Sequence, residues 1–304
     1  MKISVLTPTY NREQLLGKLY KSLIRNMNYG VDIEWLIMDD GSTDNTKNEI
    51  KKYVSENKIE IKYFYQDNQG KMSAINNLVK NANGDLIIEC DSDDYFTDDA
   101  FKIIKEEYNK NKNDDLKAYA MCFLKYNQNG NNMGKMMKKE RTTMFDLYFK
   151  EEENGEKALV FYTKIRKKYS YKLENNEKFV TEARMYHEMD LSYNIICINK
   201  PIMICEYQKE GYTQNIKKQF IENPYGYYEY FKEILKRNTR KVKFNKRLYA
   251  VKHYILFTVL TKKKINIKEV NDILNKVLII ILFLPGKIKT YAMLKSDKNN
   301  SSFK

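Results

Sequence analysis

Residues 86–94 have the sequence Leu-Ile-Ile-Glu-Cys-Asp-Ser-Asp-Asp, in which an apolar run leads directly into three carboxylates within four positions. The apolar run is typical of a buried strand. Carboxylates this close repel one another unless a cation lies among them, and hard ions such as Mg²⁺ and Mn²⁺ take oxygen ligands that they share with substrate phosphates. The alternative is an acidic helix start, which the helix dipole favours. Asp98 and Asp99 fit that alternative better, because they open the next predicted helix. The cluster therefore favours a metal site.

Two further polar clusters follow apolar strand patterns nearer the N-terminus. The run 3–6 leads into residues 7–11, and the run 35–38 leads into residues 39–42. Another strand is predicted over 59–65, and helices are predicted over residues 15–24, 44–54, 71–81 and 98–112. Strands that alternate with helices of this length form right-handed βαβ units and a parallel sheet, which binds ligands at the carboxyl ends of its strands. We therefore predict an α/β fold in which the three clusters line one cleft, with Asn11 capping the first helix and Gly84 ending the third.

The remainder of the chain is predicted to contain short strands and then helices. Strands over 195–198 and 202–205 flank Pro201, a helix covers 179–191, and helices follow from about residue 227. We divide the chain into a donor-binding half over residues 1–115, a second half of the same domain over 116–222, and a basic helical region over 223–304. The longest apolar run, 277–284, has eight residues, whereas a membrane-spanning helix needs about 20.

The positive charge of the chain is concentrated in its last hundred residues. The formal net charge is +14 over 304 residues. Positions 1–204 contain 32 basic and 32 acidic residues, whereas positions 205–304 contain 22 basic and 8 acidic residues. A basic region of this kind contacts anionic lipid, nucleic acid or an acidic substrate, or it is a solvated face.

The four cysteines and two histidines do not indicate a structural zinc site. No Cys-x-x-Cys pair occurs, and the cysteines lie in apolar stretches such as 195–198. We expect them to be reduced core residues of a cytoplasmic protein. No secretory signal is expected, because the N-terminus enters a strand pattern directly.

Four motifs together resemble glycosyltransferase family 2. They are Thr7-Pro8-Thr9-Tyr10-Asn11-Arg12, residues 35–44 with Asp39-Asp40-Gly41-Ser42, Asn68-Gln69-Gly70-Lys71, and Gly84-Asp85 followed by Asp91-Ser92-Asp93-Asp94. The match covers about residues 1–110, with the motifs in the family's order and spacing. The resemblance implies a GT-A fold, which is a Rossmann-like, mostly parallel sheet flanked by helices, and sugar transfer with inversion at the anomeric carbon.

The resemblance also implies roles for single residues. Those at the nucleotide sugar would be Pro8, Thr9, Tyr10, Arg12, Asp40, Lys71, Asp91 and Ser92. Pro8, Thr9 and Tyr10 would contact the base, and Asp40 would bind the base or the ribose. Lys71 at a helix start suits the phosphates. Asp93 would bind the Mn²⁺ or Mg²⁺ ion that bridges the diphosphate.

The resemblance places a catalytic base on a helix in the second half of the chain. Glu182 is the candidate, although Ala183 stands where the family more often has an aspartate. Glu188 and Asp190 on the same segment therefore stay open as alternatives. Residues 206–215 resemble the family's mobile loop, which closes over the donor phosphates.

The function predicted from these features is metal-dependent, inverting glycosyl transfer. The donor would be a nucleotide sugar, with UDP the commonest nucleotide in the family, and the acceptor a glycan or polyprenyl-linked molecule in bacterial surface polysaccharide (capsule) synthesis. Residues 227–304 would contact the anionic inner face of the plasma membrane. One alternative is a sugar-phosphate nucleotidyltransferase, whose glycine-rich first loop residues 7–11 do not provide. The other is a basic nucleic-acid- or membrane-binding protein without catalysis, but no nucleic-acid motif occurs and no nucleic-acid partner is expected.

Overall fold

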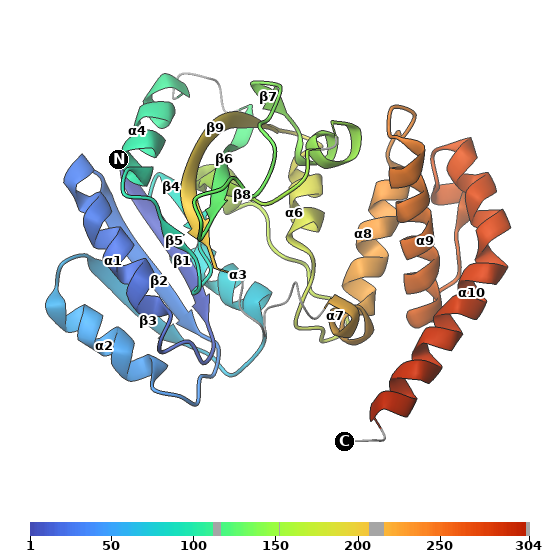
Figure 1. Cartoon of the computed structure of the whole chain (residues 1–304), viewed down its shortest axis with the longest axis horizontal. Helices are drawn as coiled ribbons and strands as arrows, with labels where there is room; N and C mark the ends of the chain where they lie inside the picture. The colour runs from blue at the N-terminus through green and yellow to red at the C-terminus, as the bar shows by residue number, and fades with distance from the viewer. Residues whose placement is uncertain (112–116, 152, 207–215, 302–304) are drawn as a thin grey trace. The chain divides into compact units, whose positions relative to one another are not determined.

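The computed structural model describes residues 1–111, 117–151, 153–206 and 216–301. It divides into two compact units. The first comprises Met1–Tyr171 and Met185–Gly211, and the second comprises Lys172–Arg184 and Tyr212–Lys304. Figure 1 shows the chain coloured along its length.

The first unit alternates strands and helices through its first hundred residues, as predicted. Its elements in chain order are β1 (Lys2–Thr9), α1 (Leu16–Asn26), η1 (Met27–Tyr29), β2 (Asp32–Asp39), α2 (Thr46–Glu56), β3 (Glu60–Tyr65), α3 (Lys71–Asn81), β4 (Leu86–Glu89), β5 (Tyr95–Phe96), α4 (Ala100–Asn111), β6 (Ala118–Asn127), β7 (Arg141–Thr142), the π-helical turn η2 (Asp146–Lys150), β8 (Lys157–Tyr162), α5 (Thr163–Arg166) and β9 (Asn194–Cys205). The helix α6 (Glu182–Met189) begins in the second unit and ends in the first. The two-residue strands β5 and β7 escaped the sequence analysis, because two residues are too few to show a period.

These strands form one sheet in the order β3-β2-β1-β4-β8-β6-β9-β5, with β7 paired to β9. The four strands β3, β2, β1 and β4 are all parallel. The strand β8 is antiparallel to β4 and to β6, whereas β6 and β9 are parallel. The α/β fold with parallel pairing around the first strand is confirmed, and the second half of the sheet adds strands of both directions.

Two prolines lie inside strands, at positions where the sequence pattern predicted that a strand would end or be interrupted. The apolar run 3–6 marked the first strand, but β1 extends through Pro8 to Thr9. The ladder between β1 and β4 stops at the Leu6–Glu89 pair. Pro8 has no backbone N–H, and none is needed at its position because β4 offers no partner there. Pro201 likewise lies within one continuous strand, β9, whose register against β6 shifts beside it. The bulge absorbs the proline.

The caps predicted for two helices are wrong. Asn11 does not cap α1; it has a φ of 51°, and its Oδ1 accepts a hydrogen bond from the Thr43 backbone N–H at 2.8 Å. The helix α3 ends at Asn81 rather than at Gly84. Gly84 is required for close approach instead, because a Cβ there would lie 2.7 Å from the Ser4 backbone nitrogen.

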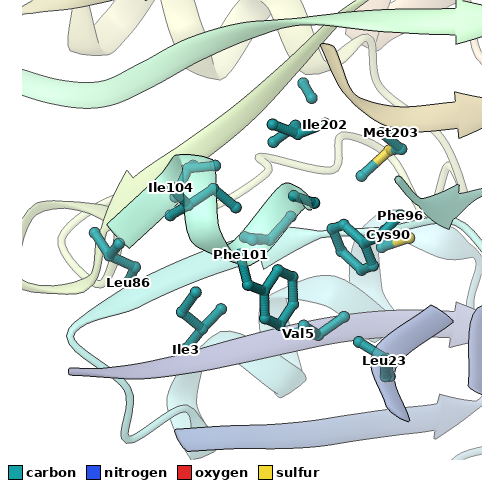
Figure 2. Packing of buried hydrophobic residues seen from close by; sticks show 14 of the residues in the cluster. Ile3, Val5, Leu23, Leu86, Cys90, Phe96, Phe101, Ile104, Ile202 and Met203 are labelled. Atoms are coloured by element: carbon teal, nitrogen blue, oxygen red, sulfur yellow. The ribbon is translucent and has the colours of Figure 1, made fainter. Parts of the chain in front are cut away.

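The main core lies on one face of the sheet. The helices α1, α2 and α4 cover this face, whereas α3 contacts β1 and β2 from the other side. The packed cluster joins residues from β1, β4, α4 and β9, including Ile3, Val5, Phe101, Ile202 and Met203 (Figure 2). This packing holds the carboxyl ends of the parallel strands in one rigid edge.

The buried carboxylate of Glu34 ties the amino ends of these strands together. Its Oε1 accepts hydrogen bonds of 2.5 Å from the Ser4 hydroxyl and the Asn83 backbone N–H, and its Oε2 accepts one of 3.1 Å from Lys62. Burial opposes ionisation, but these hydrogen bonds outweigh it and lower the pKa of Glu34 to about 2.

The second unit is helical. Besides the start of α6 it contains α7 (Ile216–Glu222), α8 (Pro224–Lys236), α9 (Phe244–Leu260), η3 (Ile267–Glu269) and α10 (Ile273–Ser301). The prediction of helices from about residue 227 is confirmed. Within the described ranges no helix has both the length and the apolar character needed to cross a membrane.

Candidate active site

The carboxyl ends of the parallel strands bring the sequence motifs to one edge of the sheet. Thr9 pairs with Asp39, and Asp39 with Tyr65, at the last positions of β1, β2 and β3. The strand β4 ends nearby at Glu89, immediately before the acidic cluster. The predicted convergence of the polar clusters on one edge is therefore observed.

Asp40 holds the loop between β3 and α3. Its carboxylate is buried, and Oδ1 accepts hydrogen bonds from the Gln66 side chain at 2.7 Å and the Gln69 backbone N–H at 2.8 Å. Its Oδ2 accepts a third from the Gly70 backbone N–H at 2.8 Å. Gly70 has a φ of 92°, a conformation that L side chains rarely adopt. These contacts start α3 at Lys71.

Lys71 connects this loop to the acidic cluster. Its Nζ lies 2.8 Å from Asp91 Oδ2. Burial works against ionisation of Asp91, but the Lys71 ammonium outweighs it and lowers the pKa of that carboxyl. Asp91 is therefore an anion whose orientation is set by a cation from the start of α3.

Asp93 has the opposite electrostatic setting. Burial, together with the negative charges of Asp91 and Asp94, raises the pKa of Asp93 to about 6, and the nearby Arg12 only partly offsets this. A divalent cation would relieve that repulsion, so the donor set suits Mg²⁺ or Mn²⁺. In the described part of the chain, no three His, Cys, Asp or Glu side chains converge on one ion position. Such an ion would therefore need further oxygen ligands from a bound phosphate.

Asp94 contacts residues of β6 and β9 within the fold. It is buried, and its Oδ2 lies 3.2 Å from Lys125 Nζ on β6 and accepts from the Cys205 thiol on β9 at 3.2 Å. Burial raises the pKa of Asp94 despite the Lys125 ammonium. Its neighbour Ser92 is also buried.

The end of β1 supplies the remaining predicted donor residues. Pro8 and Thr9 are buried, whereas Tyr10 is 46% exposed. The Thr9 hydroxyl is buried without a hydrogen-bond partner among the described residues, and a buried polar group of this kind usually marks a missing partner. Arg12 is half-buried, and its charge acts on Asp91 and Asp93.

The candidates for the base differ in their surroundings. Glu182 is half-buried at the start of α6, in the second unit, and its role stays a prediction, as does that of the half-buried Glu188. Asp190 accepts hydrogen bonds from the backbone N–H groups of Met144 and Phe145 at 3.1 and 2.8 Å. Both carboxylate oxygens of Asp190 therefore already accept hydrogen bonds from the backbone.

Two other features of the second half of the chain are a buried histidine and the predicted mobile loop. His187 is buried with its ring edge-on to Phe145 and Phe149, at 5.3 and 6.0 Å between centroids. Of the predicted mobile loop 206–215, residues 207–215 lie outside the described residues.

A buried network beside the acidic cluster escaped the sequence analysis. Arg166 on α5 is fully buried, and its Nε donates to Glu89 Oε1 at 2.7 Å. The Tyr171 hydroxyl donates to Glu89 Oε2 at 2.6 Å. The only signal in the sequence was a glutamate ending an apolar strand, because Arg166 lies 77 positions away from it. This network fixes the last residue of β4, two positions before Asp91.

Comparison with known proteins gives a family match over the segment that carries these motifs and a set of similar relatives. The model of the family described as glycosyl transferase family 2 matches residues 4–174, more than half of the chain. The chain is 36% identical over 131 residues to the uncharacterized glycosyltransferase MG060 of Mycoplasma genitalium, covering 41% of this chain and 44% of that protein. It is 31% identical over 102 residues to the poly(ribitol-phosphate) beta-N-acetylglucosaminyltransferase TarS of Staphylococcus aureus, covering 34% of this chain and 18% of that protein. The matches therefore span less than half the length of these relatives.

Two solved structures share the fold over nearly the whole chain. One is S. aureus TarS 1–349 in complex with UDP-GlcNAc, with a TM-score of 0.60 at 18% identity, covering 99% of this chain and 92% of that one. The other is a mannosyltransferase from Pyrobaculum calidifontis in complex with GDP-Man and Mn²⁺, with a TM-score of 0.54 at 12% identity, covering 99% and 81%. At such identities these likenesses establish the fold.

Proposed function

Because this chain belongs to glycosyl transferase family 2 and has the GT-A fold of its structural neighbours, we propose that it transfers a sugar from a UDP-sugar to a glycan or polyprenyl-linked acceptor, with inversion. The contact between Lys71 and Asp91 is the observation that carries this proposal. It joins the start of α3 to the acidic cluster after β4, at the sheet edge where such folds bind ligands.

The nucleotide would lie against the ends of β1 and β2. The Thr9 hydroxyl, which has no hydrogen-bond partner in the described ranges, would offer a polar atom to a base. The half-exposed Tyr10 and the buried Pro8 would offer an aromatic ring and an apolar wall. Asp40 would accept a further hydrogen bond from the nucleotide, and it would hold the loop between β3 and α3 in place. Lys71 would face the phosphates from the start of α3. Uridine as the base is supported by the UDP-GlcNAc in TarS.

A divalent metal ion would be held by Asp93, with Asp91 beside it and phosphate oxygens of the donor completing its ligands. When bound, the ion would neutralise charge on the leaving diphosphate. The raised pKa of Asp93 supports this placement, because burial and the like charges of Asp91 and Asp94 both oppose ionisation of this carboxyl group. The neighbour from P. calidifontis contains Mn²⁺.

The reaction would be a single displacement. The acceptor hydroxyl gives its proton to the Glu182 carboxylate while its oxygen bonds to the anomeric carbon. The bond from that carbon to the phosphate oxygen breaks on the opposite face, and its electron pair leaves with UDP. Lys71 and Arg12 would stabilise the charge that develops on the diphosphate.

The setting we propose is bacterial surface polysaccharide synthesis at the inner face of the plasma membrane. The acceptor would then be a glycan chain or a polyprenyl-linked intermediate, which the basic region 227–304 would approach together with anionic lipid. The excess of 22 basic over 8 acidic residues after position 204 supports this location.

UDP release from a panel of UDP-sugars with Mn²⁺ tests the proposal. Asp93→Asn is expected to lower turnover at least about 100-fold, because the ion would lose its protein ligand, and to weaken Mn²⁺-dependent UDP binding in calorimetry. Asp98→Asn is the matched control, since its side chain is 78% exposed and pairs only with Arg25 among the described residues. Full activity of the Asp93 variant would defeat the metal assignment.

The base is tested separately in the same assay. Glu182→Gln is expected to lower kcat by roughly 10²–10⁴-fold with UDP binding unchanged, which is the usual contribution of a general base. An unchanged kcat in that variant, with a loss in Glu188→Gln, would move the role to Glu188.

A further inference from the structure

The outer face of α10 carries a continuous stripe of exposed apolar side chains. Its members recur every three or four residues along about 27 Å of helix, at 1.5 Å per residue. They are Ile273, Leu274, Val277, Ile280, Ile281, Leu284, Ile288 and Tyr291. Ile273 and Leu284 are 79% and 66% exposed. Proteins rarely leave so long an apolar surface in water unless it meets a partner.

The opposite face of α10 is anchored, so the stripe cannot turn inward. Asn275, Ile279 and Thr290 on that face are buried. A Cβ at Gly286 would lie 2.8 Å from Ile255 Cγ2, so the glycine lets α10 approach α9 closely. Because the opposite face of α10 packs inward, with Gly286 against α9, the stripe faces outward.

A polar cavity of about 660 Å³ adjoins the start of the stripe. Its lining is Asn238, Arg240, Arg247, Asn271, Asp272, Ile273 and Lys276. Arg247 is neutralised by Asp272, which it contacts directly. Neither Arg240 nor Lys276 forms an ion pair with a described residue, so the cavity keeps a positive charge at its rim. Ile273 and Lys276 belong to α10, which makes the cavity and the stripe one surface.

We propose that this surface binds a membrane of anionic phospholipid, with headgroup phosphates at Arg240 and Lys276 and the stripe lying among the upper acyl chains. Residues 273–296 contain no acidic side chain, so nothing along the stripe repels an anionic surface. A second copy would bring two strongly basic regions together, and nucleic acid offers no apolar surface to cover the stripe. The inference sharpens the membrane contact proposed above, and the donor chemistry is measured independently of it.

Co-sedimentation of the full chain with lipid vesicles tests this surface. Vesicles of phosphatidylcholine are compared with vesicles containing about 30% phosphatidylglycerol. We expect the chain to pellet with the anionic vesicles and to stay in solution with the neutral ones. Ile281→Glu with Leu284→Glu should lower binding at least about tenfold, because two charges would enter the apolar layer. Val54→Glu with Leu191→Glu, at exposed apolar positions of the first unit, should bind like the wild type.

The charged part of the surface has its own variant and control. Arg240→Glu with Lys276→Glu should lower binding to anionic vesicles roughly tenfold or more, whereas Lys47→Glu with Lys51→Glu, on exposed positions of α2, changes the net charge equally and should have little effect. UDP-sugar turnover in solution should be normal in all four variants, which separates this test from that of the proposed function.

Three results would overturn the proposal. The wild type could stay in solution with anionic vesicles, or the Ile281/Leu284 variant could pellet as the wild type does. Light scattering could instead show a wild-type dimer that this variant converts to a monomer, which would make the stripe an interface between copies.

Discussion

Replacing Asp40 with alanine removes the acceptor that holds the loop carrying Lys71. Asp40 is 4% exposed, and its carboxylate accepts three hydrogen bonds of 2.7–2.8 Å, from Gln66, Gln69 and Gly70. These three donors lie 26–30 positions from Asp40 in the sequence. Only the tertiary fold brings them to its carboxylate. The Asp40 carboxylate thus accepts three of the hydrogen bonds that hold this loop, beside those from the Asn68 amide to the Asp40 carbonyl and from the Asn77 amide to the Gln66 side chain.

The magnitude follows from the burial of the donors. The Gly70 N–H is buried, so the loss of its charged acceptor costs about 1.5–3 kcal/mol, and the two donors nearer to water cost about 1 kcal/mol each. Asp40→Ala should therefore lower the free energy of unfolding by about 3–5 kcal/mol. Asp40→Asn keeps one acceptor oxygen and should lose roughly half as much.

Urea denaturation followed by circular dichroism measures the unfolding free energy, and calorimetry measures the affinity for UDP. Asp67→Ala is the control, because Asp67 is exposed in the same loop. We expect stability and UDP affinity to fall together in Asp40→Ala and neither to change in the control. A loss of UDP affinity with stability within about 1 kcal/mol of wild type would refute the reasoning, because Asp40 would then act on the nucleotide as a direct ligand and not through the loop.

Two further predictions concern the other end of the sheet. Gly84→Ala should destabilise the fold by about 2–4 kcal/mol, because its Cβ would lie 2.7 Å from the Ser4 backbone. In the control Gly17→Ala the Cβ would meet only the Tyr53 hydroxyl at 3.3 Å, so stability should change by less than about 1 kcal/mol. Thermal denaturation of both variants checks this, and equal melting temperatures would contradict it. The pKa of Glu34 is lowered to about 2 in the fold, so its contribution is complete above the ordinary pKa of a glutamate and is lost as the pH falls toward 2. The unfolding free energy should decrease by up to roughly 3 kcal/mol between pH 5 and pH 2 on this account, and a Glu34→Gln variant with the same pH dependence as wild type would show that other groups are responsible.

Sequence periodicity determined the longer strands and helices of the first hundred residues and the edge of the sheet where they place their polar ends. The helix over 71–81 and the strand ending before Asp91 have the predicted positions. Both follow from local spacing, since a helix and a strand expose different periods of apolar residues. The four motifs, too, lie in short segments that can be recognised without knowledge of the fold.

The tertiary structure alone decided what each polar side chain at that edge contacts. Asp40 faces inward to the 66–70 loop, Asp94 faces Lys125 on β6, and Asp91 faces Lys71. Three aspartates in similar sequence settings thus have three different partners, 20–31 positions away. Such pairs depend on which strands are neighbours and on which face of the sheet a side chain leaves. Local spacing carries no information on either, because the sheet order is set by packing between segments that are distant in the chain.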